Sequence, residues 1–222
     1  MARRSNAQLS EATRGALLES ARAAFAEHGF ADAPLEDLLR DTGLSKGALY
    51  HHFGSKQGLF IAVVQAIDAQ IVARIRAAVP EHAVTRAAFI AACRIYLQAT
   101  LEPGVRRILL LDCPAVLGYR ATRELDAQTS IKPIAEVLVA LAAAGEVGEI
   151  DAEATAHLIN GALYDAALWI GDSKRPRQAL DRAMLAFERL LSGLAPASRA
   201  AQPSSTGSTS SDQRTRRASR KP

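Results

Sequence analysis

Apolar residues recur every three to four positions along most of the chain, which is the period of α-helices that bury one face. Few stretches alternate apolar and polar residues, so the pattern gives little evidence for β-strands. The first helix is expected over residues 11–28, where Ser10 is a suitable N-cap and Gly29 ends the pattern. Its inner face is formed by Leu17, Leu18, Ala21, Ala24 and Phe25. The chain is therefore predicted to be all-α.

The segment from Pro34 to Phe60 predicts two short helices around a tight turn. An apolar stripe at helical spacing is formed by Leu35, Leu38 and Leu39. This helix should end just before Gly43, which suits a C′ position with positive φ. Ser45 is a natural N-cap for the next helix. Two helices joined by a short turn that contains glycine form the helix-turn-helix pattern, in which the second helix enters the major groove of DNA.

The second of these helices has two chemically different faces when it is counted from Lys46 at about 100° per residue. One face consists of Lys46, Gly47, Tyr50, His51 and Gly54. The other face consists of Ala48, Leu49, His52 and Phe53. The first face offers a cation, a hydroxyl, an imidazole and two positions without bulk, whereas the second offers mainly apolar anchors. Such a helix can approach phosphates and base edges closely while its other face packs on the protein.

Residues 11–60 resemble the DNA-binding domain of the tetracycline-repressor (TetR) family of bacterial transcriptional regulators. The resemblance rests on ARAAFAEHGF at 21–30 and on LEDLLRDTGLSKGALYHHFGSKQGLF at 35–60. One departure is Ala33, because the family usually has Ser or Thr at the N-cap of the second helix. A hydroxyl that could contact phosphate is missing there, so only the backbone N–H groups of that helix start remain.

The resemblance implies a DNA-binding transcriptional regulator, and the chain contains no GxSxG, HExxH or phosphate-cradling glycine motif that would indicate an enzyme. The expected protein is a homodimeric repressor that binds a palindromic operator in double-stranded DNA and is released by a small-molecule effector of unknown identity. It is expected in the bacterial cytoplasm, at the nucleoid when operator-bound. Two alternatives stay open: a ligand-independent regulator or activator, and a helical small-molecule carrier with a vestigial DNA-binding domain.

Nine residues are expected to contact DNA through phosphate or the grooves. They are Arg3, Arg4, Ser45, Lys46, Gly47, Tyr50, His51, His52 and Lys56. His52 lies toward the packed side of its helix, and only the resemblance places it near a phosphate. Adjacent histidines on a helix diverge by about 100°, so His51 and His52 are not expected to share a metal ion. An ordinary solvated helix is the alternative for this face.

The remaining chain predicts a connector and a second helical domain. A long helix should follow Ser55 and end near Ala78, and Ala-, Leu- and Ile-rich helices are expected over 84–101, 104–117, 121–144, 151–171 and 175–194. The expected domains are 1–55 for the DNA-binding domain, with residues 1–9 as a flexible basic arm, 56–195 for the connector and the effector-binding and dimerisation domain, and 196–222. This last segment is polar and basic and should be disordered, because it has too little apolar surface to offset its ordering entropy.

Polar and aromatic residues interrupt the apolar helices of the second domain, as in a ligand cavity but also as in many ordinary cores. The candidate pocket residues are Phe89, Cys93, Tyr96, Asp112, Cys113, Asn160, Tyr164 and Trp169. Small and apolar residues at helical spacing in the last two helices predict a dimer surface, with internal packing as the alternative. The candidate dimer residues are Leu158, Gly161, Ala162, Asp165, Phe187, Leu190 and Leu191.

The positive charge of the chain belongs mainly to its C-terminal tail. The whole chain has a formal net charge of +4, and residues 196–222 contain six basic residues and one acid. Residues 1–195 are therefore near −1, so DNA binding must depend on local placement of cations and helix N-termini. The two cysteines match no metal-binding spacing, and neither a metal nor a cofactor is expected. No signal-peptide pattern and no long apolar run is found, so no membrane partner is expected.

Overall fold

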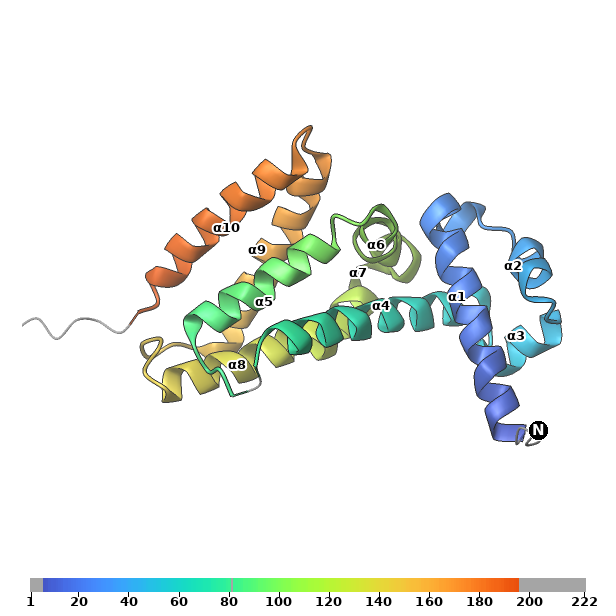
Figure 1. Ribbon diagram of the computed structural model, residues 1–222, viewed down its shortest axis with the longest axis horizontal. Coiled ribbons are helices and arrows are strands. Elements are labelled where there is room, and N and C mark those ends of the chain that lie inside the picture. The colour runs from blue at the N-terminus through green and yellow to red at the C-terminus, as the bar shows by residue number, and fades with distance from the viewer. Residues whose placement is uncertain (1–5, 81, 196–222) are drawn as a thin grey trace, which may run out of the picture.

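The computed structural model describes residues 6–80 and 82–195, and every regular element within them is a helix, as the sequence predicts. Arg3 and Arg4 and the tail at 196–222 lie outside the described residues. Figure 1 shows one group of helices at the N-terminal end and a second group at the other end, with α4 running between them. The first group is α1 (Asn6–Asp32), α2 (Leu35–Thr42) and α3 (Lys46–Phe53), followed by α4 (Lys56–Ala78).

The second group contains α5 (Arg86–Ala99), α8 (Lys132–Ala143), α9 (Ala152–Asp172) and α10 (Pro176–Ser192). Between α5 and α8 the chain forms α6 (Pro103–Arg106), the π-helical turn η1 (Arg107–Asp112), α7 (Cys113–Asp126) and a second π-helical turn η2 (Ala127–Ile131). In Figure 1 these elements lie between the two groups. The chain thus returns to the N-terminal group after α5 before it completes the second group.

The turn residues of the helix-turn-helix take the conformations that the sequence predicts. Gly43 ends α2 with φ 64°. The Ser45 hydroxyl accepts a hydrogen bond from the Ala48 N–H at 3.2 Å, so Ser45 is the N-cap of α3. At the start of α2 the N-cap is Pro34 rather than Ala33, and no side chain caps this end. The expected lack of a hydroxyl at the start of α2 therefore holds, although the cap position is shifted by one residue.

The start of the first helix differs from the sequence prediction, because α1 begins at Asn6 rather than at residue 11, so residues 6–9 are helical and not part of an arm. The predicted break between 117 and 121 takes the form of a kink: Gly118, with φ 77°, interrupts α7, and no loop separates its two parts. The sequence did not predict the two π-helical turns η1 and η2, because hydrophobic spacing does not reveal such turns.

The N-terminal core is built around aromatic and leucine side chains from four helices. Phe25 of α1 and Phe60 of α4 pack edge to face with ring centroids 5.4 Å apart. Leu38 of α2 and Leu49 of α3 are also almost fully buried in this cluster. Burying side chains of this size contributes about 1.5–3 kcal/mol each, so α3 is held on the domain mainly through Leu49 and its partly buried neighbours.

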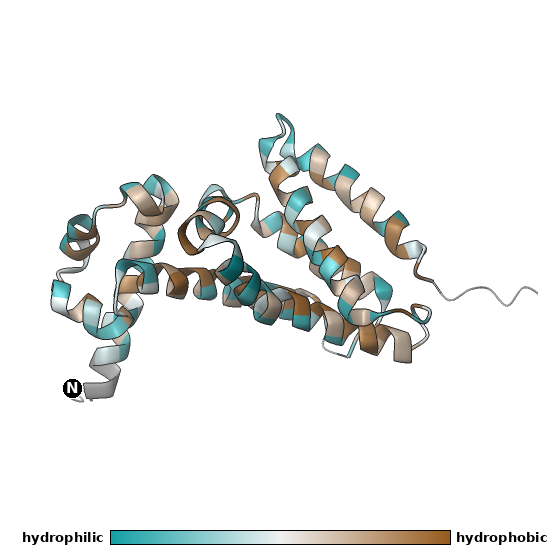
Figure 2. Cartoon of the chain, turned by 180° about the vertical axis from the view of Figure 1, so that it is seen from behind, coloured by the Kyte–Doolittle hydropathy of each residue, from teal (hydrophilic) through white to brown (hydrophobic). Residues whose placement is uncertain are grey.

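The connector α4 belongs to both halves of the protein. Its buried residues are Leu59, Phe60, Val63, Val64, Ile67 and Ile71. Among the described residues it is the one helix with the length and hydropathy of a membrane span. Figure 2 shows apolar residues along α4 where it passes between the other helices. Packing within the protein buries the six residues named above.

The C-terminal half of the molecule has its own core. Its fully buried members include Leu138 and Leu141 of α8, Ile170 of α9 and Met184 of α10. Leu97 of α5 joins this cluster, whereas Ala99 at the end of the same helix belongs to the N-terminal core. The helix α5 therefore leads directly from one core to the other.

The turn η1 fastens the C-terminal half to the end of α1. The Arg107 guanidinium donates hydrogen bonds to the carbonyl oxygens of Glu27 at 2.6 Å and His28 at 3.1 Å. The Asp112 carboxylate accepts a hydrogen bond from the Phe30 N–H at 2.9 Å. These bonds satisfy backbone groups that the end of a helix leaves without partners.

Close packing accompanies these hydrogen bonds. A Cβ atom on Gly104 would lie 2.7 Å from the Cβ of Ala26, so only glycine permits this approach of α6 to α1. Ile108 of η1 is completely buried in the N-terminal core. On the other side, the neighbouring Arg106 forms an ion pair with Asp172 of α9. Adjacent residues at the junction of α6 and η1 thus contact both halves of the protein.

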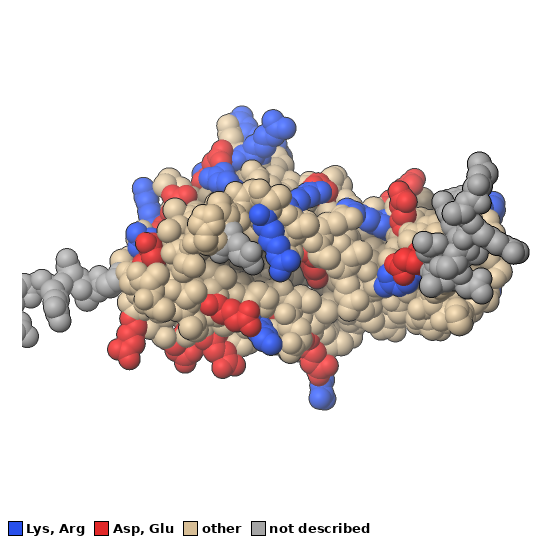
Figure 3. Space-filling view, turned by 60° about the horizontal axis from the view of Figure 1, so that its bottom comes forward, with Lys and Arg blue, Asp and Glu red and all other residues tan. Residues whose placement is uncertain are grey.

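Figure 3 shows charged side chains of both signs on one face, with several Asp and Glu along its lower left edge and most Lys and Arg above them. Both signs on one face agree with the near-neutral charge of residues 1–195.

The role of η1 as a part of the N-terminal core can be tested with two matched truncations. Ile108→Ala should lower the free energy of unfolding by about 2–4 kcal/mol, because it removes a fully buried side chain. Leu111→Ala in the same turn should cost less than about 1 kcal/mol, because Leu111 is 46% exposed. Urea unfolding followed by circular dichroism measures both. Equal losses in the two variants would contradict the packing of η1.

Candidate functional site

The face of α3 that the sequence predicts to be outward is exposed in the structure. Its exposed residues are Lys46, Gly47, Tyr50 and His51. The opposite side consists of the completely buried Leu49 and the partly buried Ala48, His52 and Phe53. α3 is therefore a short helix that is anchored on one side and presents its polar side to the outside.

The start of α3 offers two groups that suit a phosphate. The Lys46 ammonium lies 3.7 Å from the Glu36 carboxylate, and both side chains are largely exposed. Because an exposed ion pair contributes only about 0–1 kcal/mol, a phosphate can replace Glu36 at small cost. The Ser45 hydroxyl oxygen accepts from the Ala48 N–H, so its own O–H remains available to donate.

The two adjacent histidines have different surroundings. Their ring centroids lie 5.3 Å apart in an edge-to-face arrangement. The His51 side chain is exposed, whereas His52 is partly buried and lies beside the ring of Phe53 at 6.1 Å. Of the two, His51 is therefore the one on the outward face with Tyr50.

Lys56 is less available than the sequence suggests. Its ammonium lies 4.8 Å from the ring centroid of Phe30 and donates a hydrogen bond to the Ala31 carbonyl at 3.4 Å. Partial burial lowers the pKa of Lys56, an effect that the nearby carboxylates of Asp32 and Glu36 oppose. The side chain is thus engaged with the end of α1 and would have to leave it to contact a phosphate.

Arg14 is a neighbouring cation that the sequence reasoning did not single out. Its guanidinium lies 5.7 Å from the ring centroid of Phe53, at the end of α3. It also forms an i,i+3 ion pair with Glu11 at 3.9 Å. No pattern within residues 6–32 indicates this position, because it depends on where α1 crosses α3.

A cavity of about 270 Å³ lies in the C-terminal half, with walls from α4, α5, η2, α8 and α9. Four of the eight residues predicted for a pocket line it: Phe89, Cys93, Tyr96 and Asn160. The walls also include residues that the sequence reasoning missed: Asp68, Ile71, Val72, Ile75, Arg76, Ala92, Thr129, Ser130, Pro133, Ile134, Val137 and Leu163. Most are apolar, which is typical of a site for a small organic ligand.

The other four predicted pocket residues do not line this cavity. Asp112 accepts a hydrogen bond from Phe30 at the junction with α1, and Cys113 is buried in the N-terminal core. The Tyr164 hydroxyl donates to the Leu110 carbonyl at 2.9 Å. Trp169 is 45% exposed on α9, with the guanidinium of Arg182 5.5 Å from its ring centroid. We therefore leave these residues out of the candidate pocket.

Two polar groups of the cavity have no partner within the described part of the chain. Neither the Asp68 carboxyl nor the Tyr96 hydroxyl forms a hydrogen bond or ion pair there. Burial, assisted by the negative charge of Asp126, raises the pKa of Asp68 to about 6. Burial also raises the pKa of Tyr96, with further contributions from Asp68 and Asp126. An ionisable carboxyl and a phenol thus line one largely apolar cavity, and no described cation pairs with the carboxyl.

Buried thiols and titratable groups elsewhere do not form a metal site. Burial raises the pKa of Cys113 to about 11, so this thiol stays protonated at neutral pH. Within residues 6–80 and 82–195, no group of three or more His, Cys, Asp and Glu side chains is placed to hold a metal ion.

The outer surface of α9 and α10 contains exposed apolar side chains. Leu158 is 75% exposed and Leu190 is 71% exposed. The predicted dimer residues Gly161, Ala162 and Asp165 are exposed on the same helix as Leu158. Phe187 and Leu191 are instead buried in the C-terminal core, so we leave them out of a dimer surface.

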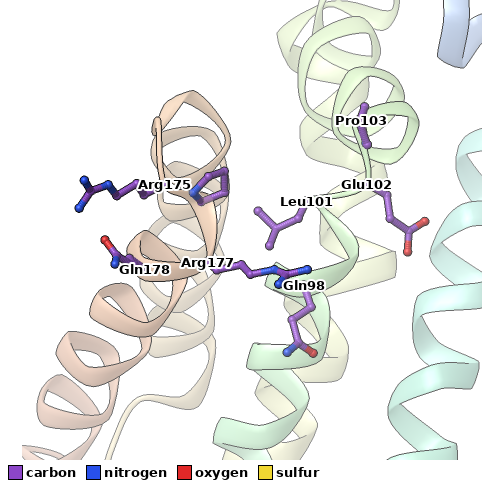
Figure 4. Close-up of a pocket in the computed structure, with 8 residues that line it drawn as sticks. Gln98, Leu101, Glu102, Pro103, Arg175, Arg177 and Gln178 are labelled. Atoms are coloured by element: carbon purple, nitrogen blue, oxygen red, sulfur yellow. The ribbon is translucent and has the colours of Figure 1, made fainter.

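A second hollow lies between the end of α5 and the start of α10. Figure 4 shows that Arg177 extends from α10 toward Gln98. Arg175 and Gln178 instead point away from Gln98 and Leu101. The Glu102 carboxylate at its edge pairs with Arg74. Although this hollow is larger, at about 700 Å³, it is wide open and its polar groups do not converge. The cavity beside Asp68 is therefore the better candidate for a ligand site.

Comparison with known proteins gives matches to both halves of the chain. Residues 17–63 match the family model described as bacterial regulatory proteins, tetR family. Residues 86–194 match the tetracyclin repressor-like C-terminal domain. The chain is 38% identical to a TetR-family transcriptional regulator from Pectobacterium atrosepticum of known structure, with a TM-score of 0.70 and coverage of 86% of this chain and 98% of that one.

Two curated relatives match about a quarter of the chain. The HTH-type transcriptional repressor AcnR of Corynebacterium glutamicum is 47% identical over 53 residues, which are 24% of this chain and 28% of AcnR. The HTH-type transcriptional regulator UidR of Escherichia coli is 38% identical over 64 residues, which are 29% of this chain and 33% of UidR. The matched segment thus spans about a third or less of these relatives.

The unpaired Asp68 carboxyl should make stability depend on pH. Since the pKa of Asp68 is raised from 3.8 to about 6, the folded state keeps a proton that the unfolded state has lost in this range. The free energy of unfolding therefore falls as the pH rises from the lower of these two pKa values to the higher. Asp68→Asn removes the carboxylate and with it this loss of stability at higher pH. The change should raise the free energy of unfolding by roughly 1–3 kcal/mol at about pH 7 and by little at about pH 4.

Urea unfolding at both pH values measures this difference. Glu136→Gln, at an exposed position of α8, is the control and should change stability by less than about 0.5 kcal/mol at either pH. A gain for Asp68→Asn that does not depend on pH would contradict the burial of an unpaired carboxyl.

Proposed function

Because the chain belongs to the TetR family of bacterial transcriptional regulators, we propose that it is a repressor that binds a palindromic operator as a homodimer and leaves it when a small molecule enters the cavity beside Asp68. The observation that supports this most directly is the outward face of α3. It combines Lys46, Tyr50 and His51 with an unobstructed Gly47 on a helix held by buried Leu49.

The proposed DNA contacts divide into phosphate and groove contacts. Lys46 and Ser45 at the start of α3 supply donors for a phosphate, and Arg14 lies near the other end of the helix. Tyr50 and His51 follow on the outward face, where they reach the base edges or the opposite backbone. Phosphate contacts fix the position of the protein, whereas contacts to base edges select the sequence.

A dimer follows from the small size of the reading surface. α3 has only eight residues, so one copy contacts few base pairs. Two copies related by a twofold axis read two half-sites, with centres about 34–36 Å apart or a multiple of that spacing, in a palindrome. The exposed Leu158 and Leu190, with the small Gly161 and Ala162 beside them, supply the apolar surface for this dimer.

Release by a ligand requires a connection from the cavity to α3. The helix α4 supplies one route, because Asp68, Ile71 and Ile75 line the cavity while Phe60 of the same helix packs against α1. The run from η1 to η2 supplies another, because Arg107 binds the end of α1 and Thr129 lines the cavity. A ligand that favours one arrangement by about 1–3 kcal/mol would lower the operator affinity roughly 5- to 150-fold.

Removing the Lys46 ammonium should weaken operator binding. Lys46→Ala is expected to lower the affinity about tenfold, because one phosphate contact is lost. The slope of log affinity against log salt concentration should also become shallower by about one. Fluorescence anisotropy at several salt concentrations measures both, with a duplex recovered from genomic fragments that the wild-type protein binds. Lys132→Ala, exposed on α8, is the matched control. Equal effects of the two changes would show that Lys46 does not contact DNA.

A charge in the α9–α10 surface should prevent dimer formation. Leu158→Glu or Leu190→Glu would place a carboxylate in the proposed apolar interface, so we expect monomers at concentrations where the wild type is dimeric. Val139→Glu, at a 59% exposed position on α8, should leave the dimer intact. Sedimentation velocity measures the mass. A dimer that persists in both leucine variants would place the interface elsewhere.

A further inference from the structure

The cavity beside Asp68 has an acidic interior and an apolar lining. Asp68 is partly buried, lines the cavity, and has neither a hydrogen bond nor an ion pair within the described part of the chain. Phe89, Ile71 and Leu163 contribute apolar or aromatic surface to the same walls. The site therefore lacks a positive charge next to its carboxyl, although an unpaired carboxylate in apolar surroundings is costly.

The charged and titratable groups around Asp68 do not neutralise it. Asp126, the last residue of α7, adds negative charge, and its own carboxylate pairs with Arg123 at 3.4 Å. Arg123 also lies 3.2 Å from a ring nitrogen of His157. Cys93 and Tyr96 of α5 and Cys113 of α7 are the other titratable neighbours, and burial raises the pKa of all three, which keeps them uncharged at neutral pH.

The one basic residue in the cavity walls lies away from Asp68. Arg76 is exposed on the last turn of α4, eight positions after Asp68, which corresponds to about two turns of helix. Its guanidinium is therefore at the rim and cannot serve as the partner of the inner carboxyl. The structure thus separates an acidic interior from a basic edge.

We propose that the ligand of this cavity is a small amphiphilic cation, with a protonated amine beside Asp68 and an apolar body against Phe89, Ile71 and Leu163. The Tyr96 hydroxyl oxygen can accept a hydrogen bond from the ammonium, and the aromatic faces of Tyr96 and Phe89 favour a nearby cation. The volume of about 270 Å³ is at the lower limit of sites for drug-sized ligands. This inference rests on the proposed effector function of the cavity and adds the chemical class of the effector.

The charge of Asp68 gives such a ligand a characteristic pH dependence. Burial and the negative charge of Asp126 disfavour the Asp68 carboxylate and raise its pKa to about 6. A bound cation stabilises the carboxylate form of Asp68. At a pH below the pKa of Asp68, binding therefore requires the carboxyl to lose its proton. The affinity should therefore be constant above about pH 7 and fall as the pH decreases toward about 5.

Three probes of nearly the same shape distinguish the charge that the cavity prefers. They are 4-phenylbutylammonium, 4-phenylbutanol and 4-phenylbutyrate, titrated into the full chain by calorimetry at about pH 7.5 and at about pH 5. We expect the ammonium to bind at least about tenfold more tightly than the other two at the higher pH and to lose this advantage at the lower pH. Asp68→Asn should abolish the preference but retain binding of the alcohol, whereas Glu136→Gln should change nothing.

Three results would overturn this inference: no binding of the ammonium, an equal affinity for the three probes, or a preference for the carboxylate that Arg76→Ala removes. The effector proposal is tested separately, by adding the same probes to the operator complex. If the ammonium binds through Asp68 but leaves the operator affinity unchanged, the ligand chemistry is supported and the effector role fails. If the carboxylate or the alcohol releases the operator and the ammonium does not, the effector role is supported and the cationic ligand is excluded.

Discussion

The contact between η1 and the end of α1 fixes how the two halves of the protein are placed. Gly29 interrupts the helical geometry of α1, and the backbone groups around it need partners from elsewhere. Arg107 donates to the carbonyls of Glu27 and His28, and Asp112 accepts from the Phe30 N–H. These three hydrogen bonds exist only while η1 lies against the end of α1, so they link the orientation of the helix-turn-helix to the C-terminal half.

The junction between α6 and η1 gives the proposed regulation a physical basis. Arg106 pairs with Asp172 of α9, while the adjacent Arg107 binds α1. From η1 the chain continues through α7 to η2, which forms part of the cavity wall. Movement of that wall can therefore change the support of α1 as well as the position of α4. Since both routes end on the domain that presents α3, a ligand needs no direct contact with the DNA-binding face to affect it.

The sequence predicts local features of this protein better than contacts between distant segments. The limits of α4 and the N-cap Ser45 follow from nearby residues, and the structure confirms them. Half of the predicted pocket residues line the cavity, but Asp68 was missed because α4 was interpreted only as a connector. Whether a polar residue on an amphipathic helix faces solvent or a cavity depends on helices far away in the sequence, so Tyr164 and Asp68 could not be assigned from periodicity.

Binding of the full chain to the DNA upstream of its own coding region tests the central claim, sequence-specific recognition through α3, most directly. Fluorescence anisotropy at near-physiological salt, with excess competitor DNA, should show saturable binding with two chains per site. Such binding would establish an operator, because attraction to phosphates alone is lost to the competitor. Binding that disappears with competitor, both for this DNA and for every fragment in a genome-wide selection, would contradict the account.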